Sequence, residues 1–477
     1  MATCLFATCR RSAPRSGGCS LLLWMDAQAL KALALLVAGW MALPCAPAFG
    51  WSNHSVASYR AFEAMPEVAG AAPVRAEPLE AFLKDQERAI ETLLARQEVW
   101  ARATIAAYAP RPDGLAFKAM AGRSDAERRQ AFLMALRVSP DSKFALYLQP
   151  DPQARLAAAT VLPHSAVNAL PEQAHSSYRF IAIAAGERVS ALAVLASATD
   201  EPDYGLDINL WQDSPSPSAK VYGFGPIPFG NPALYFATQA PFHMGFYHQA
   251  WLISKAAPFI QRTFPLLRVH QYSGLAALAF QSGHAYWGWR FAGLALHYVQ
   301  DLTQPYHASL APGDSTWTML SANAMAMAGW PRRKEQLIVL LSNRHLALEK
   351  YQNQTLLNDA RSGQDSAAQL ALRSATRDTA YPAWDALYAR DVVAREAYAA
   401  GAALASAIVA AMPARLVSDP DFDFGVREAE IDLVAEMQRQ DPTRIGELDR
   451  MLADLLGRFG AHSRNAIRGI LKAAARP

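Results

Sequence analysis

The sequence predicts an all-α protein. Hydrophobic residues make up 52% of its 477 residues and charged residues only 18%, a composition that excludes a disordered chain and provides for a large core. Alanine is abundant, β-branched residues are sparse, and apolar residues recur at helical spacing in most segments. We therefore expect a multi-helix protein whose helices are separated by long loops and helical insertions.

Residues 1–50 are expected to form a secretory signal peptide. Basic residues precede an apolar run over 32–43, and the Ala-Phe-Gly of residues 48–50 places small residues at the −3 and −1 positions. The run is too short for an ordinary membrane span, although a membrane anchor is an alternative reading. Met25 is an alternative start. We expect a secreted or periplasmic protein whose mature chain begins at Trp51.

Removal of this leader would change both the cysteine content and the charge. The leader holds all the cysteines (Cys4, Cys9, Cys19 and Cys45), so the mature chain would have neither disulfides nor thiolate metal sites. The leader also carries four Lys and Arg residues and one Asp. Its loss from totals of 45 and 42 leaves 41 charges of each sign. A neutral protein is a poor candidate for strong non-specific nucleic-acid binding.

Helical periodicity and helix-breaking residues divide the rest of the chain. A helix should open near His54, with Ser52 or Asn53 as its cap. Proline-rich stretches over 66–78 and 214–232 are expected to be a connector and a loop. Further helices are expected over residues 80–108, 125–138, 272–301 and 378–412, and as two amphipathic helices within 426–477 separated at Asp441-Pro442.

The stretch 296–307 carries the strongest chemical signal. His297 and Asp301 stand one helical turn apart, so both side chains point the same way. Pro305 disfavours helix at the preceding residue, so the chain should turn there and allow His307 to return toward the pair. Three groups that bind divalent metals at the end of an apolar helix indicate part of a metal site. The alternative is a hydrogen-bonded His–Asp pair.

Other segments contain further metal-binding groups. His345 and Glu349 form a second pair at i, i+4, and either an incidental helical pair or a ligand pair explains that spacing. An acidic turn near residue 200 could supply a carboxylate or be a solvated loop. His243 and His248 are five residues apart, so at most one of them should be a ligand.

Taken together, these residues resemble the superfamily of zinc-dependent phospholipases C and single-strand-specific nucleases. The resemblance extends over residues 51 to about 350, and it is specific at HxxxDxxxxxH (297–307) and at a leader that ends directly before a Trp. It implies a helical secreted enzyme with three clustered zinc ions. The domains would be a catalytic domain over 51–425 and a helical extension over 426–477.

The resemblance also implies which residues would hold each zinc ion. One ion would take the amine and carbonyl of Trp51 together with His54. A second would take His297, His243 and Asp200, and Asp301 would bridge these two ions. Asp200 would also orient or deprotonate the attacking water, and Asp203 and Asp207 are alternatives to it. The third ion would take His307, His345 and Glu349. His54 follows Trp51 more closely than is usual in the family, and large insertions separate the ligands.

The expected reaction is hydrolysis of the glycerol-side phosphodiester of phosphatidylcholine-like lipids. The glutamate at 349 and the Gln-Pro-Tyr-His-Ala of residues 304–308 resemble the lipase form, and the neutral charge suits a phospholipid substrate at a membrane surface. No stable nucleic-acid partner is expected, and no protein partner is inferable. The alternatives are a single-strand nuclease or 3′-nucleotidase on the same metal core, and a helical binding protein without catalytic activity.

Overall fold

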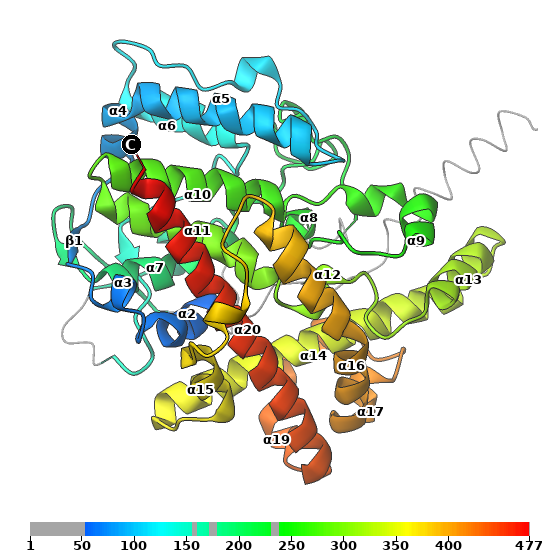
Figure 1. Ribbon diagram of the computed structural model, residues 1–477. Helices are drawn as coiled ribbons and strands as arrows, with labels where there is room; N and C mark the ends of the chain where they lie inside the picture. Colours follow the sequence, from blue (N-terminus) through cyan, green and yellow to red (C-terminus); the bar gives the residue numbers. More distant parts are fainter. Residues whose placement is uncertain (1–52, 155–159, 171–178, 230–237, 477) are drawn as a thin grey trace, which may run out of the picture. The chain divides into compact units, whose positions relative to one another are not determined.

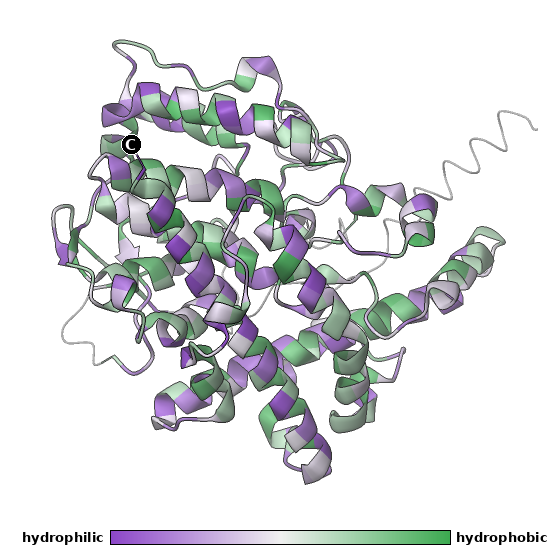
Figure 2. Ribbon diagram, in the orientation of Figure 1, coloured by the Kyte–Doolittle hydropathy of each residue, from purple (hydrophilic) through white to green (hydrophobic). Residues whose placement is uncertain are grey.

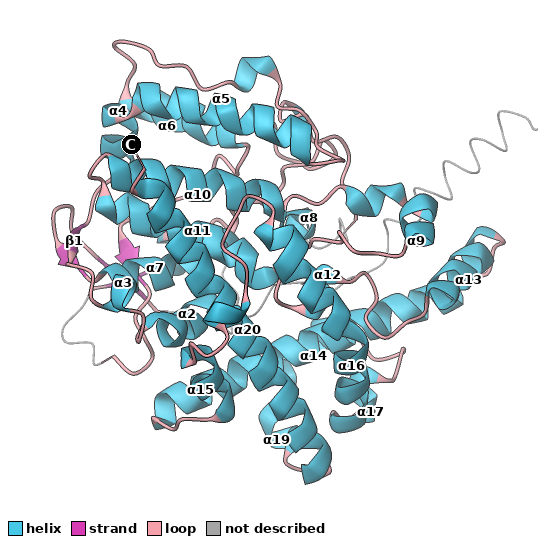
Figure 3. Ribbon diagram, in the orientation of Figure 1, coloured by secondary structure: helices cyan, strands magenta, loops and turns pink. Residues whose placement is uncertain are grey.

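The computed structural model describes residues 53–154, 160–170, 179–229 and 238–476, all within one compact unit, Leu43–Pro477. The expected leader and Trp51 lie outside the described residues. Helices dominate the described residues, and the strands are only two or three residues long (Figure 3). The all-α class is therefore confirmed.

The amino-terminal half contains helices and two small sheets. The helices are α2 (His54–Phe62), α3 (Pro66–Ala69), α4 (Leu79–Asp85), α5 (Glu87–Thr104), η2 (Asp113–Leu115), α6 (Asp125–Leu136), η3 (His164–Ala166), α7 (Ala191–Thr199), η4 (Glu201–Tyr204) and η5 (Ser218–Lys220). The strands are β1 (Val74–Arg75), β2 (Tyr147–Leu148), β3 (Val161–Leu162), β4 (Phe180–Ala182) and β5 (Arg188–Val189). Strand β1 pairs with β5, and the other sheet has the order β2-β4-β3, with all pairs antiparallel.

The second half contains the longest helices together with several short ones. They are α8 (Ala240–His243), α9 (Trp251–Ala256), η7 (Pro258–Gln261), α10 (Pro265–Gln281), α11 (Ala285–Asp301), α12 (Pro305–Ala308), α13 (Thr316–Met327), α14 (Arg332–Ser362), α15 (Ala367–Arg373), η8 (Asp378–Ala380), η9 (Ala389–Ala394), α16 (Arg395–Ala411), α17 (Ala414–Val417), α18 (Phe424–Arg427), η10 (Glu428–Glu430), α19 (Leu433–Met437) and α20 (Pro442–Ala474).

The prediction of one helix over 272–301 is wrong. The structure has two helices there, α10 and α11, which pack against each other (Figure 1). Gly283 between them has φ +84°, a conformation that glycine adopts without steric cost, so the chain reverses at this point. The expected buried central helix is α11 alone, whose side chains from Tyr286 to Asp301 are all buried against α10, α7 and α20.

Other helix boundaries also differ from those that the helical spacing of apolar residues predicts. The helix expected over 80–108 is divided at Gln86 into α4 and α5. The segment 378–412 becomes η8, a loop, the π-helical η9 and α16. Asp441 does begin a helix, because its side chain accepts a hydrogen bond from the Thr443 N–H and Pro442 follows at the first helical position. The helix expected before it is replaced by the short α18, η10 and α19.

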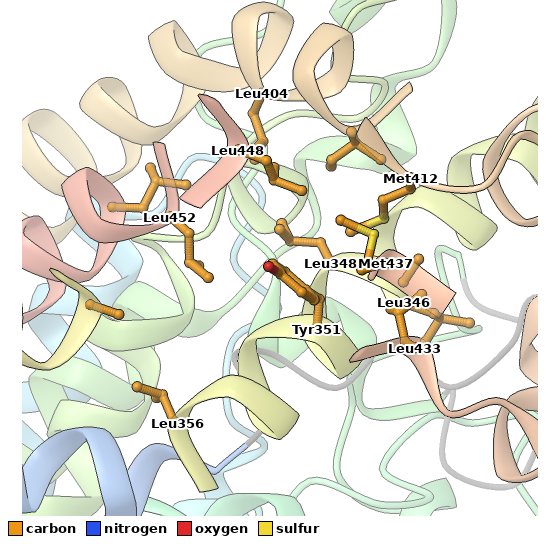
Figure 4. Close-up of a cluster of buried hydrophobic side chains, with 14 of the residues drawn as sticks. Leu346, Leu348, Tyr351, Leu356, Leu404, Met412, Leu433, Met437, Leu448 and Leu452 are labelled. Carbon is orange, nitrogen blue, oxygen red and sulfur yellow. The ribbon is translucent and has the colours of Figure 1, made fainter. Parts of the chain in front are cut away.

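The carboxyl-terminal helix α20 packs against the elements that surround the ligand candidates. It contacts α2, α10, α11, α15 and α16, so residues 426–477 share one compact unit with the rest. Leucines of α20 also enter a hydrophobic cluster with one face of α14 (Figure 4), where Leu348 and Tyr351 meet Leu448 and Leu452. This packing fixes the rotation of α14 about its axis, and thereby the direction of its ligand pair.

One described helical stretch, Ala389–Ala411, is long and apolar enough to cross a membrane by length and composition. It comprises η9 and α16, and 39% of its most apolar window is buried. The stretch packs on α12 and α20. Its apolar side chains therefore already support α12, the short helix that carries His307.

Candidate metal centre

Six helices of different lengths bring the candidate ligands together from distant parts of the sequence. His54 is the first residue of α2, and Asp203 lies in η4 directly after α7. The remaining candidates are His243 at the end of α8, His297 and Asp301 on α11, His307 on α12, and His345 and Glu349 on α14. All of these residues except Asp203 are buried.

The α11 pair stands at the centre of this arrangement. Asp301 Oδ2 lies 2.9 Å from His243 Nδ1 and 3.2 Å from His297 Nε2. The other oxygen of Asp301, Oδ1, lies 3.3 Å from His54 Nε2. The two oxygens of one carboxylate thus face two different sets of histidines, which is the geometry that a bridging ligand requires.

Hydrogen bonds orient several of the imidazoles for metal binding. His297 Nδ1 donates to the carbonyl oxygen of Thr199 at 2.7 Å, and His54 Nδ1 donates to Gln300 Oε1 at 2.9 Å. His307 Nδ1 donates to the carbonyl oxygen of His243 at 3.0 Å. In each ring the Nδ1 proton is engaged, so the Nε2 lone pair faces the cluster. Metal-ligating histidines are oriented in the same way by partners of their second nitrogen.

The α14 pair forms a separate set with His307. His345 Nε2 lies 2.6 Å from Glu349 Oε1, and His307 Nε2 lies 3.7 Å from the same oxygen. Gln304 Nε2 donates to Glu349 Oε1 at 3.2 Å. Gln304 has an extended backbone, as Pro305 predicts, and this turn lets α12 present His307 to α14.

The spacing of the ligand atoms fits metal ions. Bonds of about 2.0–2.1 Å in a tetrahedral zinc site place ligand atoms roughly 3.3 Å apart, close to the distances around Asp301. Among the described residues, His54 Nε2, Asp301 Oδ1 and His345 Nε2 are buried without a hydrogen-bond partner of normal geometry. Buried polar atoms are rarely left in that state, because desolvation is costly. The described residues therefore include three overlapping or adjacent groups that could hold a metal: His54–Asp203–His297, His243–His297–Asp301 and His307–His345–Glu349.

Charge compensation differs between the two helical pairs. Burial raises the pKa of Asp301, but the charge of His297 and the hydrogen bond from His243 outweigh it and hold that pKa well below the ordinary value. Burial lowers the pKa of His243 and His297, but Asp301 outweighs it and raises both above 6.5. Without metal, the carboxylate and the imidazoles of the α11 set therefore favour each other's charged forms.

The α14 set has the opposite character. Burial raises the pKa of Glu349 from 4.5 to about 8, although His307 opposes the shift. Burial likewise lowers the pKa of His345 from 6.5 to about 3. At neutral pH the metal-free pair is thus a protonated carboxyl beside a neutral imidazole. A cation bound here would provide the positive charge that compensates an ionised Glu349.

The structure separates the three acids of the turn that follows α7. Asp203 Oδ1 lies 3.7 Å from both His243 Nδ1 and His297 Nε2, and its side chain is 14% exposed. Asp200, the first choice from the sequence, lies outside the metal-compatible groups found among the described residues. Its oxygens accept hydrogen bonds from the Ser55 N–H at 3.3 Å and from Gln149 Nε2 at 2.6 Å. Among the described residues, Asp203 therefore lies in a group that could hold a metal ion, and Asp200 does not.

Asp207, the second alternative, has a structural role. It accepts hydrogen bonds from the guanidinium of Arg268 at 2.6 and 2.9 Å and from the Tyr298 hydroxyl at 2.6 Å. It also lies 3.7 Å from His243 Nε2, the nitrogen opposite the one that faces the cluster. That distance is too long for a hydrogen bond, so Asp207 lies beside the His243 ring without fixing its orientation.

Other histidines in the described part of the chain have partners outside the cluster. His248 bonds to the Arg390 carbonyl oxygen and His284 to Glu77, so His243 alone of its sequence pair enters the cluster. His164 contacts Asn168, and His175 lies outside the described residues. Sequence reasoning missed Gln300 and Gln149, which orient His54 and Asp200. Gln300 could have been found, because it lies on α11 between the two ligand candidates, whereas Gln149 directly follows β2 and is remote in sequence.

Comparisons with known proteins add no relatives. No protein-family model, curated protein or solved structure matches this chain.

Proposed function

We propose that this chain is a zinc-dependent phospholipase C. The observation that carries the proposal is the position of Asp301 between two sets of buried histidines, next to a third set on α12 and α14. All of these ligand atoms are nitrogen or oxygen, as the absence of cysteine after residue 45 requires. Imidazole and carboxylate ligands suit zinc, and adjacent zinc ions suit phosphodiester hydrolysis.

We assign the ligands to three ions on the proximity of their side chains. Asp301 would bridge two zinc ions, one held with His54 and the other with His243, His297 and Asp203. His307, His345 and Glu349 would hold the third. The amine and carbonyl of Trp51 would complete the first set once the leader is removed, which also implies export from the cytoplasm. Bound zinc would supply Lewis acidity that activates water and neutralises the phosphate oxygens.

The side chains then have distinct tasks in the reaction. A water oxygen adds to phosphorus, the bond from phosphorus to the glycerol oxygen breaks, and that oxygen takes a proton, giving diacylglycerol and a phosphorylated head group. Asp203 is the most exposed carboxylate of the cluster, so it is the best placed to orient or deprotonate the water. Asp200 has both oxygens engaged and instead fixes the start of α2, and thereby His54.

The test compares two substrates with the mature protein. We expect release of phosphocholine from phosphatidylcholine, loss of activity on chelation, and recovery with zinc. Faster release of nucleotides from single-stranded DNA would replace the lipase with the related nuclease. Activity on neither substrate in a zinc-loaded protein would contradict the proposal.

A further inference from the structure

Exposed tryptophans and aliphatic residues gather on α9, α13 and the turn that follows α13. Trp251, Trp317 and Trp330 are 70%, 73% and 66% exposed. We call these three, together with Leu252, Met325 and Met327, the tryptophan surface; all six are among the large hydrophobic side chains that are exposed in the described part of the chain. Large exposed apolar patches mark sites of interaction with proteins or membranes.

Helix α13 has the composition of an interfacial helix rather than of a packed one. It contains no Asp, Glu, Lys or Arg, and Ala322 is its one buried residue. It pairs with the start of α14 (Figure 1), where the polar residues 332–336 are followed by the half-buried aliphatic residues 337–341 (coloured by hydropathy in Figure 2). Core packing accounts for Met319 and Leu320 on this helix, whereas Trp317, Met325 and Met327 remain exposed.

Cationic side chains flank the tryptophan surface. Lys255 lies 5.9 Å from the ring of Trp251, and Arg332 and Arg333 are exposed directly after the α13–α14 turn. Neither α9 nor α13 contains an acidic residue, and the acidic residues nearest to α13 in sequence are Asp314 and Glu335. Tryptophan rings settle at the headgroup level of a bilayer, and adjacent Lys and Arg attract anionic lipids. This complementarity identifies a lipid surface as the partner.

The tryptophan surface is continuous with the metal centre. The chain passes from His243 on α8 to α9, and from His307 on α12 to α13. A hydrophobic cluster joins these segments, in which Met244 and Ile253 are buried and Leu310 and Met319 pack against them. The surface is thus held by the same segments that supply two ligand candidates.

We propose that the tryptophan surface docks onto a bilayer that contains anionic phospholipid and brings the metal centre to its substrate. The value of docking for catalysis rests on the proposed function, whereas docking itself does not. The three tryptophans enter the headgroup region, and Lys255, Arg332 and Arg333 contact lipid phosphates. Binding should therefore weaken with ionic strength and with loss of anionic lipid.

The experiment measures vesicle binding and hydrolysis separately. The zinc-loaded mature protein is sedimented at low temperature with vesicles of phosphatidylcholine and phosphatidylglycerol at 7:3, and with phosphatidylcholine alone. The test variant is the triple W251S/W317S/W330S. The control is V426S/L370S/V161S, which removes exposed apolar side chains elsewhere. We expect the test variant to lose at least about tenfold in binding to the mixed vesicles, and the control to retain it.

Hydrolysis of a short-chain phosphatidylcholine below its micelle-forming concentration provides the second readout. The test variant should keep its rate on this monomeric lipid, which also shows that it is folded, and lose rate only on vesicles. R332Q/R333Q should reduce the preference for anionic vesicles.

Unchanged vesicle binding by the tryptophan variant would overturn the docking surface, whatever the activity. A different contradicting result is that the unsubstituted protein binds no vesicles and elutes from gel filtration as a dimer that the tryptophan variant does not form. That result would show that the surface contacts a second copy of the chain instead of a bilayer. Normal vesicle binding without any lipid hydrolysis would contradict the proposed function and leave the docking surface intact.

Discussion

The pairs on α11 and α14 have the same spacing and opposite electrostatics. His297 and Asp301 belong to a network in which the pKa of the acid is lowered and the pKa of the imidazole is raised. His345 and Glu349 show the reverse, with a pKa near 3 for the imidazole and near 8 for the acid. The difference arises because four histidines lie around Asp301, whereas Glu349 is buried beside a neutral ring. The environment therefore decides which pair is ionised before metal binds.

The largest expected effect follows removal of the Asp301 charge. Asp301→Asn should abolish binding of the two zinc ions that it bridges and reduce activity well beyond the roughly 100-fold typical of an orienting residue. It should also destabilise the metal-free protein by about 3–5 kcal/mol, because the buried imidazoles lose the carboxylate that they contact. Elemental analysis and denaturant unfolding measure both effects. Asp421→Asn, on an exposed carboxylate, is the control.

Glu349→Gln provides the matched change in the α14 set. It should remove one ion and leave the two at Asp301, with loss of most activity. It should not destabilise the metal-free protein near pH 8, since a neutral side chain replaces a carboxyl that is costly to ionise. If Glu349→Gln destabilised the protein as much as Asp301→Asn, the result would contradict the electrostatic difference between the two pairs.

The pH dependence of stability sharpens the same contrast. The folded-state pKa of Glu349, about 8, exceeds its ordinary value of 4.5, so the metal-free folded state binds the extra proton between these values. Wild-type stability relative to Glu349→Gln should therefore fall as pH rises from about 4.5 to 8. Unfolding curves of both metal-free proteins at a series of pH values measure this difference. A difference that is constant with pH would place Glu349 in a solvated environment.

Variants of Asp203 and Asp200, the two acids after α7, should differ in their zinc content. Asp203→Asn should lower zinc occupancy at the α11 set, because its carboxylate faces His243 and His297. Asp200→Asn should retain the zinc and lose roughly 10–100-fold in activity, as expected for an orienting residue. Zinc titration of both variants decides the assignment, and the reverse pattern would restore Asp200 as the ligand.

The smallest effects should follow substitution of two glutamines, each of which forms a hydrogen bond with one ligand candidate. Gln300→Leu removes the acceptor for His54, and Gln304→Leu removes the donor to Glu349. Each should weaken zinc binding by roughly tenfold at its own set. Competition with a chelator of known affinity measures this loss. Equal loss at both sets from either substitution would mean that the sets are not independent.

Local rules predict only part of this structure. The i, i+4 spacings and Pro305 place the pairs on helices and turn the chain toward His307, because these effects act within a few residues. The sequence does not predict the reversal at Gly283 or the division at Gln86, because apolar residues keep their helical spacing on both sides of each short interruption. The choice of Asp203 over Asp200 depends on Gln149 and Ser55, which reach Asp200 through tertiary packing. No local pattern encodes that contact.

The most direct measurement is the zinc content of the purified mature protein and of Asp301→Asn, determined together with protein concentration. We predict close to three zinc ions per chain for the former and one for the variant, retained by His307, His345 and Glu349. A protein that is folded and free of zinc after dialysis against micromolar zinc, or a variant with unchanged content, would contradict the metal centre.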